Sequence, residues 1–112
     1  MTSPRLNRHL ILEDSYRSPD GAGGFTTDWR VLGLLWAQVV PGTGRERADN
    51  AVALSRVPYK ITVRAAPSGA PSRPHAGQRF VDGTRIFAIT AVTEADTGGR
   101  YLMCHAEEEV AA

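Results

Sequence analysis

The sequence has little of what stabilises a secreted domain, spans a membrane or attracts a strongly charged partner. Cys104 is its only cysteine, so no intramolecular disulfide can form and an oxidising compartment is not required. No window approaches the roughly 20 apolar residues of a membrane-spanning helix, and no run resembles a signal peptide. The 13 basic and 12 acidic residues leave a formal charge of +1, too small to mark the whole chain as a nucleic-acid binder. We therefore expect a soluble protein, made in the cytosol, with no membrane partner.

The sequence also lacks the patterns that assemble common catalytic and metal sites. The histidines His9, His75 and His105 are far apart, and none stands in an HxH or HExxH pattern or beside a Cys-x-x-Cys pair. Cys104 precedes His105, but neighbours on a strand point to opposite faces, so the two cannot act as nucleophile and base. Cys104 is expected in the core. We predict that the chain is not an enzyme, with no catalytic residue, metal or cofactor.

The residues that are present suit one core surrounded by many turns. Apolar residues make up 42% of the 112, and the chain contains 11 Gly and 7 Pro. This length is near the usual size of one domain and leaves no room for a second independent core. A single loop-rich β domain over residues 1–112 is the expected organisation.

Apolar runs separated by turn formers predict about six strands. The clearest is 59–64, in which Tyr59, Ile61 and Val63 share one face. The run 32–40 is apolar almost throughout and is predicted to be buried on both faces, and 86–92 is predicted to form a buried strand. The remaining strand segments are expected at 6–13, 25–29 and 100–106. The fold class is therefore mostly β: a small antiparallel β-barrel or sandwich with long loops and at most one short helix.

Four connecting segments have distinctive compositions. Residues 18–24 are dense in Gly, Pro and Asp and predict the turn of a long hairpin that includes 25–29. The Asp82-Gly83 pair is typical of a two-residue type I′ turn. Residues 65–77 contain three Pro and no apolar period, which predicts an exposed loop. Residues 107–112 begin with three consecutive Glu and are expected to form a solvated acidic tail.

The segment from Leu35 to Glu46 combines several signals. Its apolar first half predicts a strand that buries Trp36, and Pro41-Gly42 should end that strand. Thr43 and Glu46 then have the spacing of a capping box, in which both side chains accept hydrogen bonds from free amides at a helix start. A short helix from Thr43 to about Leu54 is the prediction.

Arg45, Arg47 and Arg56 form the most basic local group of the chain. On a surface that faces nucleic acid they would contact phosphates without reading sequence. A solvated helix face, neutralised by nearby acidic residues, explains the same pattern. Trp29 and Trp36 are expected as core or interface anchors in preference to platforms for base stacking.

The order of these features resembles the phage head-tail joining family of small connector proteins, also called head completion or stopper proteins. The family typically reads Trp-Ala-x-(Ile/Val)-x-Pro-x-(Ser/Thr)-Gly-x-Glu at its centre, and Trp36 to Glu46 keeps that spacing. The family's Ile-x-(Ile/Val)-Arg strand corresponds to Ile61–Arg64, while the loop 65–77 departs from it in being richer in Pro and Ser. The other matching segments are Leu6–Leu12, Asp20–Gly24 with Trp29, Gly83 with Ile86–Ile89, and Arg100–Cys104.

The resemblance implies a structural subunit in the neck of a tailed phage or a phage-like gene transfer particle, assembled in the host bacterial cytoplasm. It implies a homo-oligomeric ring, sixfold or twelvefold, between a portal-bound adaptor protein and a tail terminator or tail tube protein. Such a ring retains packaged DNA, and Arg45, Arg47 and Arg56 would be candidates to face that DNA in the lumen. The alternatives are a tail terminator or adaptor of the same neck, or a small nucleic-acid-binding β-barrel.

Overall fold

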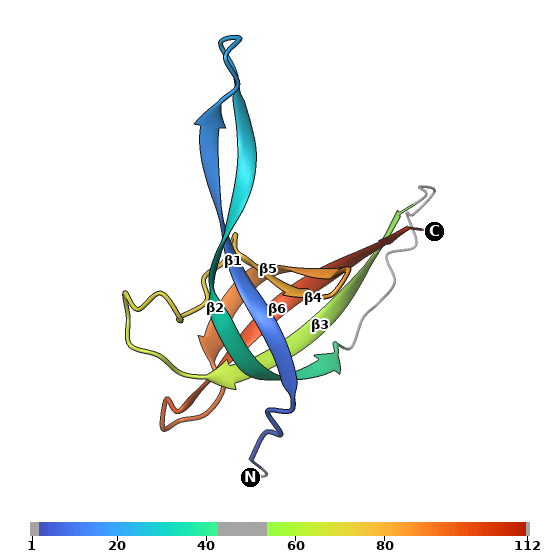
Figure 1. Ribbon diagram of the computed structural model, residues 1–112. Coiled ribbons are helices and arrows are strands. Elements are labelled where there is room, and N and C mark those ends of the chain that lie inside the picture. Colours follow the sequence, from blue (N-terminus) through green and yellow to red (C-terminus); the bar gives the residue numbers. More distant parts are fainter. Residues whose placement is uncertain (1–2, 43–53, 112) are drawn as a thin grey trace.

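The computed structural model describes residues 3–42 and 54–111 and contains six strands. They are β1 (Arg8–Pro19), β2 (Phe25–Pro41), β3 (Leu54–Arg64), β4 (Arg79–Asp82), β5 (Arg85–Glu94) and β6 (Tyr101–Ala111). All pairs are antiparallel, and the sheet closes into a barrel in the order β1-β2-β3-β6-β5-β4 (Figure 1). The predicted small antiparallel β-barrel is confirmed. No helix in this part of the chain is long and apolar enough to cross a membrane.

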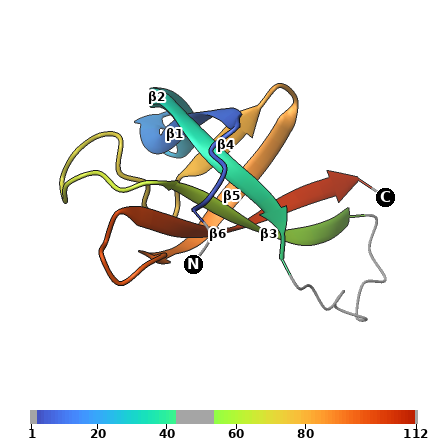
Figure 2. The ribbon, with the colours of Figure 1, turned by 90° about the horizontal axis from the view of Figure 1, so that it is seen from below.

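Period-two alternation places one side of every strand inside the barrel. Seen from below, β1 and β4 lie across from β3 and β6 (Figure 2). The inward-pointing side chains of the strands form the core. Cys104 is fully buried there, as predicted, and burial raises the pKa of its thiol to about 12. The buried apolar residues are Leu10, Leu12, Ala37, Ile61, Val63, Phe80, Phe87, Ile89, Leu102, Cys104 and Ala106.

The run 32–40, predicted to be buried on both faces, is buried on one face only, and the predicted buried strand 86–92 also has one exposed face. Trp36 in β2 is 55% exposed and Leu34 is 60% exposed, while Ala37, on the inward face of the same strand, is buried. In β5, Ile86 is 41% exposed and its neighbour Phe87 is buried. The barrel is a single layer, and no described element packs outside these strands. The prediction that Trp36 is a core residue is therefore wrong.

The turn between β4 and β5 is of a different type from the predicted type I′ turn. Asp82 pairs with Arg85, so the two central residues are Gly83 and Thr84. Gly83 has a φ of +61°, and no described residue other than glycine has positive φ. Positive φ at the first central residue alone matches a type II′ turn and not type I′.

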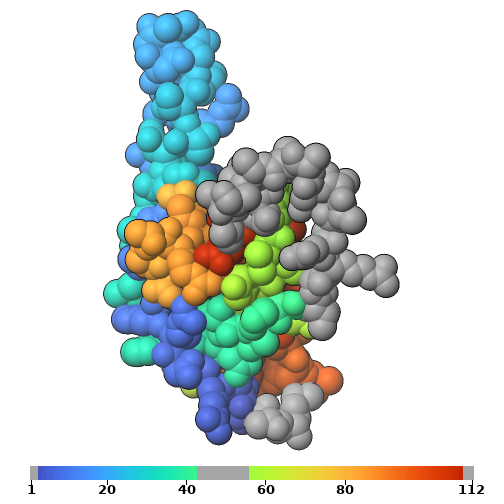
Figure 3. Space-filling view, turned by 90° about the vertical axis from the view of Figure 1, so that its right-hand side faces the viewer, coloured from blue at the N-terminus to red at the C-terminus, as the bar shows by residue number. Residues whose placement is uncertain are grey.

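The hairpin of β1 and β2 continues beyond the barrel as a two-stranded ribbon, here called the arm (residues 13–31). The arm rises as a narrow column from the rest of the molecule (Figures 1 and 3), and the longest extent of the whole molecule, arm included, is 52 Å. The predicted long hairpin is confirmed. Asp20 holds its turn, because its carboxylate accepts hydrogen bonds from the amides of Ala22 and Gly24, and these bonds lower the pKa of Asp20.

A β-bulge marks the point where the ribbon leaves the barrel. Leu12 pairs with Gly33 and Glu13 pairs with Val31, so Leu32 is an extra residue in β2. Leu32 is partly buried and packs against the core. A bulge bends its strand and increases the local twist, which turns the arm away from the barrel wall.

Other segments also differ from the sequence-based expectations. Residues 107–111 lie within β6, paired with β3, and Glu108 is only 9% exposed, so the predicted solvated acidic tail is wrong. The charges are tolerated because Glu108 has an arginine partner. Residues 65–77 connect β3 to β4 and are mostly exposed, although Pro74 is buried. The helix predicted from Thr43 falls almost wholly outside the described residues, and Leu54 begins β3.

Candidate functional site

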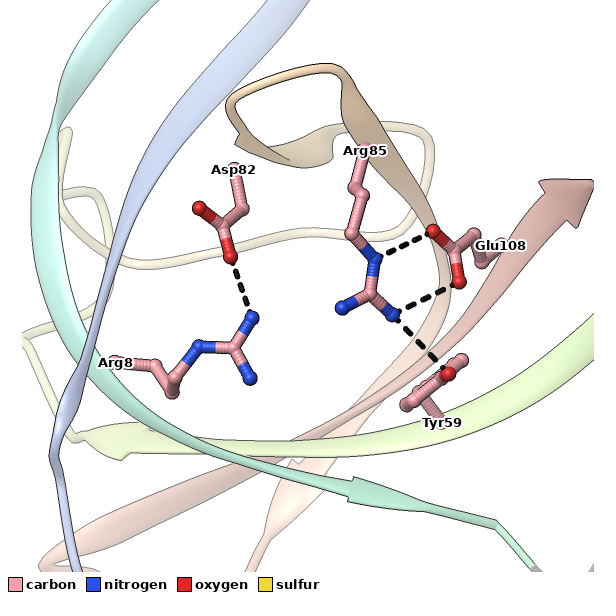
Figure 4. A network of polar contacts seen from close by, with 5 residues as sticks. All are labelled: Arg8, Tyr59, Asp82, Arg85 and Glu108. Atoms are coloured by element: carbon pink, nitrogen blue, oxygen red, sulfur yellow. Dashed lines mark hydrogen bonds and ion pairs between the residues drawn. The ribbon is translucent and has the colours of Figure 1, made fainter.

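Five polar and charged side chains close one end of the barrel interior. They come from five strands and point inward in phase with the core: Arg8, Tyr59, Asp82, Arg85 and Glu108 (Figure 4). We call them the polar plug. Arg85 donates from Nε to Glu108 Oε2 at 2.7 Å and from Nη2 to Glu108 Oε1 at 3.0 Å, and Nη2 also reaches the Tyr59 hydroxyl at 3.1 Å. Arg8 pairs with Asp82 beside them.

The ion pair between Arg85 and Glu108 stabilises the charged form of both side chains in the polar plug. The hydrogen bond from Arg85 lowers the pKa of Glu108, and the same bond raises the pKa of Arg85. The Arg85 guanidinium also lies 4.9 Å from the centroid of the Phe87 ring. No buried side-chain N or O atom among the described residues lacks a partner. A carboxylate held ionised in this way does not serve as a proton donor near neutral pH.

A second ion pair fixes the base of the arm to the barrel. Arg79 in β4 donates from Nε to Glu13 Oε1 at 2.8 Å, and both side chains are largely buried. Its guanidinium lies 3.9 Å from the centroid of the Trp29 ring. This cation–π contact packs the half-buried Trp29 ring of the arm against Arg79 of β4.

The outer face of four strands carries an unbroken row of apolar side chains. Leu34 of β2 faces Ile11 of β1, Ile11 also faces Val81 of β4, and Val81 faces Ile86 of β5. Leu34 and Ile86 are the most exposed of the four. Together with Trp36 these residues form the apolar wall. Exposed apolar residues in contact with one another, unlike scattered ones, mark interaction surfaces.

A groove of about 440 Å³ borders the apolar wall beside Trp36. Its lining is mostly apolar, and the polar residues in it are Ser72 of the loop after β3 and Arg64 at the end of β3. Arg64 forms no ion pair with any carboxylate in residues 3–42 and 54–111. Beside the groove, the His9 ring stacks on Trp36 with centroids 4.4 Å apart. The lining residues include Leu6, Leu35, Trp36, Arg64, Ala65 and Ala66.

The described part of the chain brings together no group of side chains suited to metal binding. His9 is engaged with Trp36, and Cys104 is sealed in the core with its pKa raised. A thiol without a base and without solvent access does not act as a nucleophile. The features that stand out among the described residues are surfaces suited to contact.

Comparison with known proteins identifies the family of this chain. A family model described as phage head completion protein matches residues 1–109. The chain belongs to this family. A solved chain from a structure described as the virion of a native gene transfer agent particle is 55% identical to this family member, with a TM-score of 0.85. The alignment covers 98% of this chain and 100% of that chain. No curated protein matches. The match of the family model confirms the family suggested by the sequence motifs. Head completion proteins are structural components of virions.

The structure places three of the candidate residues that were predicted from the sequence of this head completion family member. Trp29 anchors the arm and Trp36 forms the edge of an exposed groove. Arg56 is exposed, with Glu107 and Glu109 each 3.8 Å from its guanidinium. The other four candidates lie outside the described residues: Arg45, Arg47, Thr43 and Glu46.

Sequence reasoning missed both the polar plug and the groove. One sign was available for the plug: Glu108 continues the alternation of Leu102, Cys104 and Ala106, so its side chain must point inward if the strand continues. An inward carboxylate requires a cationic partner. The groove offered no such sign, because it joins residues from the N-terminal segment, β2 and the loop after β3.

Proposed function

We propose that this head completion family member is a head-tail connector, or stopper, subunit. Copies assemble as a ring, sixfold or twelvefold, in the neck of a phage or phage-like particle. One side of the ring contacts a portal-bound adaptor protein and the other side a tail terminator or tail tube protein. The ring helps to retain packaged DNA and provides the surface on which the tail docks. Assembly takes place in the host bacterial cytoplasm.

The observation that carries this proposal is the full-length similarity to a chain of a gene transfer agent virion, at 55% identity. The architecture supports it. A closed barrel gives a rigid body without free strand edges at its centre, while the arm and the loop 65–77 project from it. Projecting segments on a rigid body suit contacts between neighbours in a ring.

Residues that face the DNA are part of the same proposal. Arg45 and Arg47 follow the end of β2 in the sequence, and Arg56 lies in the first part of β3, so the three are close in sequence. Non-specific contact with phosphates in a channel needs only positive charge. For Arg56 this contact has to compete with two glutamates 3.8 Å away.

The test is a deletion of the gene in a strain that produces particles, with the wild-type gene restored as the control. We expect filled heads that leak DNA and carry no tails in electron micrographs, and normal particles after restoration. Normal tailed particles from the deletion strain contradict the proposal. Heads that keep their DNA, together with tails of irregular length, indicate a tail terminator instead.

A further inference from the structure

We infer that the arm of one copy docks in the groove beside Trp36 of the next copy. This inference rests on the proposed ring, and it names the segments that join neighbours within it. The contact is head-to-tail: each copy offers one arm and one groove, and the two surfaces differ. Head-to-tail contacts of this kind generate closed rings when the rotation between copies permits.

The arm carries side chains that its own folding does not use. Phe25 is 58% exposed near the tip, and Tyr16 is 43% exposed on the other face of the ribbon. Only cross-strand contacts hold these rings, with Arg17 4.5 Å from the Phe25 ring centroid and Arg30 5.7 Å from that of Tyr16. A two-stranded ribbon without a core is marginally stable alone in water. A surface that receives the arm therefore supplies what the ribbon lacks.

The arm also has more negative than positive charge. Between residues 13 and 31 there are four acidic and two basic residues, a net charge of −2. Glu13 pairs with Arg79 and Asp14 pairs with Arg30. The remaining acidic residues, Asp20 and Asp28, form no ion pair with a described residue, although Asp28 accepts a hydrogen bond from Ser18.

The groove is complementary to the arm in both respects. Its lining includes Leu6, Leu35 and Trp36, which offer an apolar surface to an aromatic ring such as Phe25. Arg64 at its side supplies a cation that no described carboxylate satisfies. An acidic ribbon with an exposed aromatic tip therefore fits an apolar groove with an arginine at its edge.

The arm that occupies the groove comes from a second copy, because the arm of a chain does not reach the groove of the same chain. The arm points away from the barrel, whereas the end of β3 and the N-terminal segment, which border the groove, lie on the far side of the barrel (Figure 1). The arm base is held in this direction by the Arg79 contacts with Glu13 and Trp29. Both complementary surfaces belong to the same chain, so a ring of identical copies satisfies every arm and every groove.

The test uses two variants that each lose one half of the contact. Phe25→Ser removes the arm's aromatic side chain and keeps the groove. The double variant Trp36→Ser with Arg64→Glu removes the groove and keeps the arm. Sedimentation velocity over a range of concentrations measures association of the wild type, each variant alone and an equimolar mixture. Lys60→Glu, the same change of charge as Arg64→Glu at another exposed β3 position, is the control.

We expect the wild type and Lys60→Glu to associate with increasing concentration and each variant alone to associate about 30-fold more weakly or worse. The mixture should form 1:1 dimers and nothing larger, because one intact arm meets one intact groove and the chain of contacts then stops. A wild type that stays monomeric at all concentrations, or a mixture without dimers, overturns the inference. Melting temperatures of the variants show that each is folded.

This experiment and the deletion experiment fail separately. If the deletion strain lacks tails but the mixture forms no dimer, the connector function stands and the arm contact is wrong. If the deletion strain makes normal tailed particles, the connector function is wrong whatever the proteins do in solution.

Discussion

The barrel and the arm share the strands β1 and β2 but use their side chains differently. In the barrel, alternate residues such as Leu10 and Leu12 are completely buried, whereas their outward neighbours are exposed, as is His9, or half-buried, as is Ile11. In the arm, no residue is fully buried, and beyond the contacts of Glu13 and Trp29 with β4 both faces of the ribbon meet solvent. Stability is therefore concentrated in the barrel, whereas the arm sequence is free to be shaped by whatever it contacts.

The largest effect that distinguishes the two regions should come from the core. Phe87→Ala removes a completely buried ring that contacts Tyr59 and Arg85, and we expect a loss of about 3–5 kcal/mol in the free energy of unfolding. Its neighbour Ile86 points outward, so Ile86→Ala should cost less than about 1 kcal/mol. Urea denaturation followed by tryptophan fluorescence measures both. Similar losses at the two positions would mean that the apolar wall is also packed.

The polar plug should give an intermediate, pH-dependent effect. Arg85 lowers the pKa of Glu108 in the folded state, so the pair stabilises the fold above the unfolded pKa of Glu, about 4.3, and this contribution is lost as pH falls. Glu108→Gln should therefore cost about 1–2 kcal/mol at pH 7, reduced from the value for a fully buried pair because Arg85 is partly exposed.

The same variant has a matched control in Glu109→Gln, which changes an exposed carboxylate on the same strand. Thermal melts between pH 7 and pH 3 should show the wild type approaching Glu108→Gln at the acidic end, while Glu109→Gln follows the wild type throughout. A constant difference between the wild type and Glu108→Gln at all pH values would contradict the assigned pKa shift.

The smallest effect should come from the arm. Phe25→Ser removes an exposed ring from the ribbon tip, and we expect the free energy of unfolding of the isolated chain to change by less than about 0.5 kcal/mol. The measurement is made at a concentration low enough to exclude self-association. A loss above about 1 kcal/mol would show that the arm folds as one cooperative unit with the barrel.

Much of the barrel was predictable because its strands alternate. Tyr59, Ile61 and Val63 point inward as their spacing indicates, and Cys104 lies in the core. The error at Trp36 has a physical reason: an apolar run shows that a residue avoids water somewhere, but not whether the covering layer belongs to the same chain. In an isolated subunit of an assembly, a surface reserved for a partner has the composition of a core.

The candidate site was less predictable because it depends on contacts between distant segments. Arg85 and Glu108 are 23 positions apart and meet only because β5 and β6 pair in one register. Glu108 was read as part of a solvated tail because three consecutive glutamates suggest solvent, although its neighbours face outward and it faces inward. Register, unlike composition, is set by the whole sheet.

The extra residue Leu32 gives the arm a property that matters for how related particles diverge. Beyond this bulge the ribbon has its own register, so residues can be added to the arm without shifting any pair in the barrel. One residue added to each strand would exchange the two faces of the tip and move Phe25 to the opposite side. Two added to each strand would restore the faces and lengthen the arm by about 7 Å. The length of the arm can therefore change in steps of two residues per strand, and the distance that the arm spans can evolve independently of the barrel.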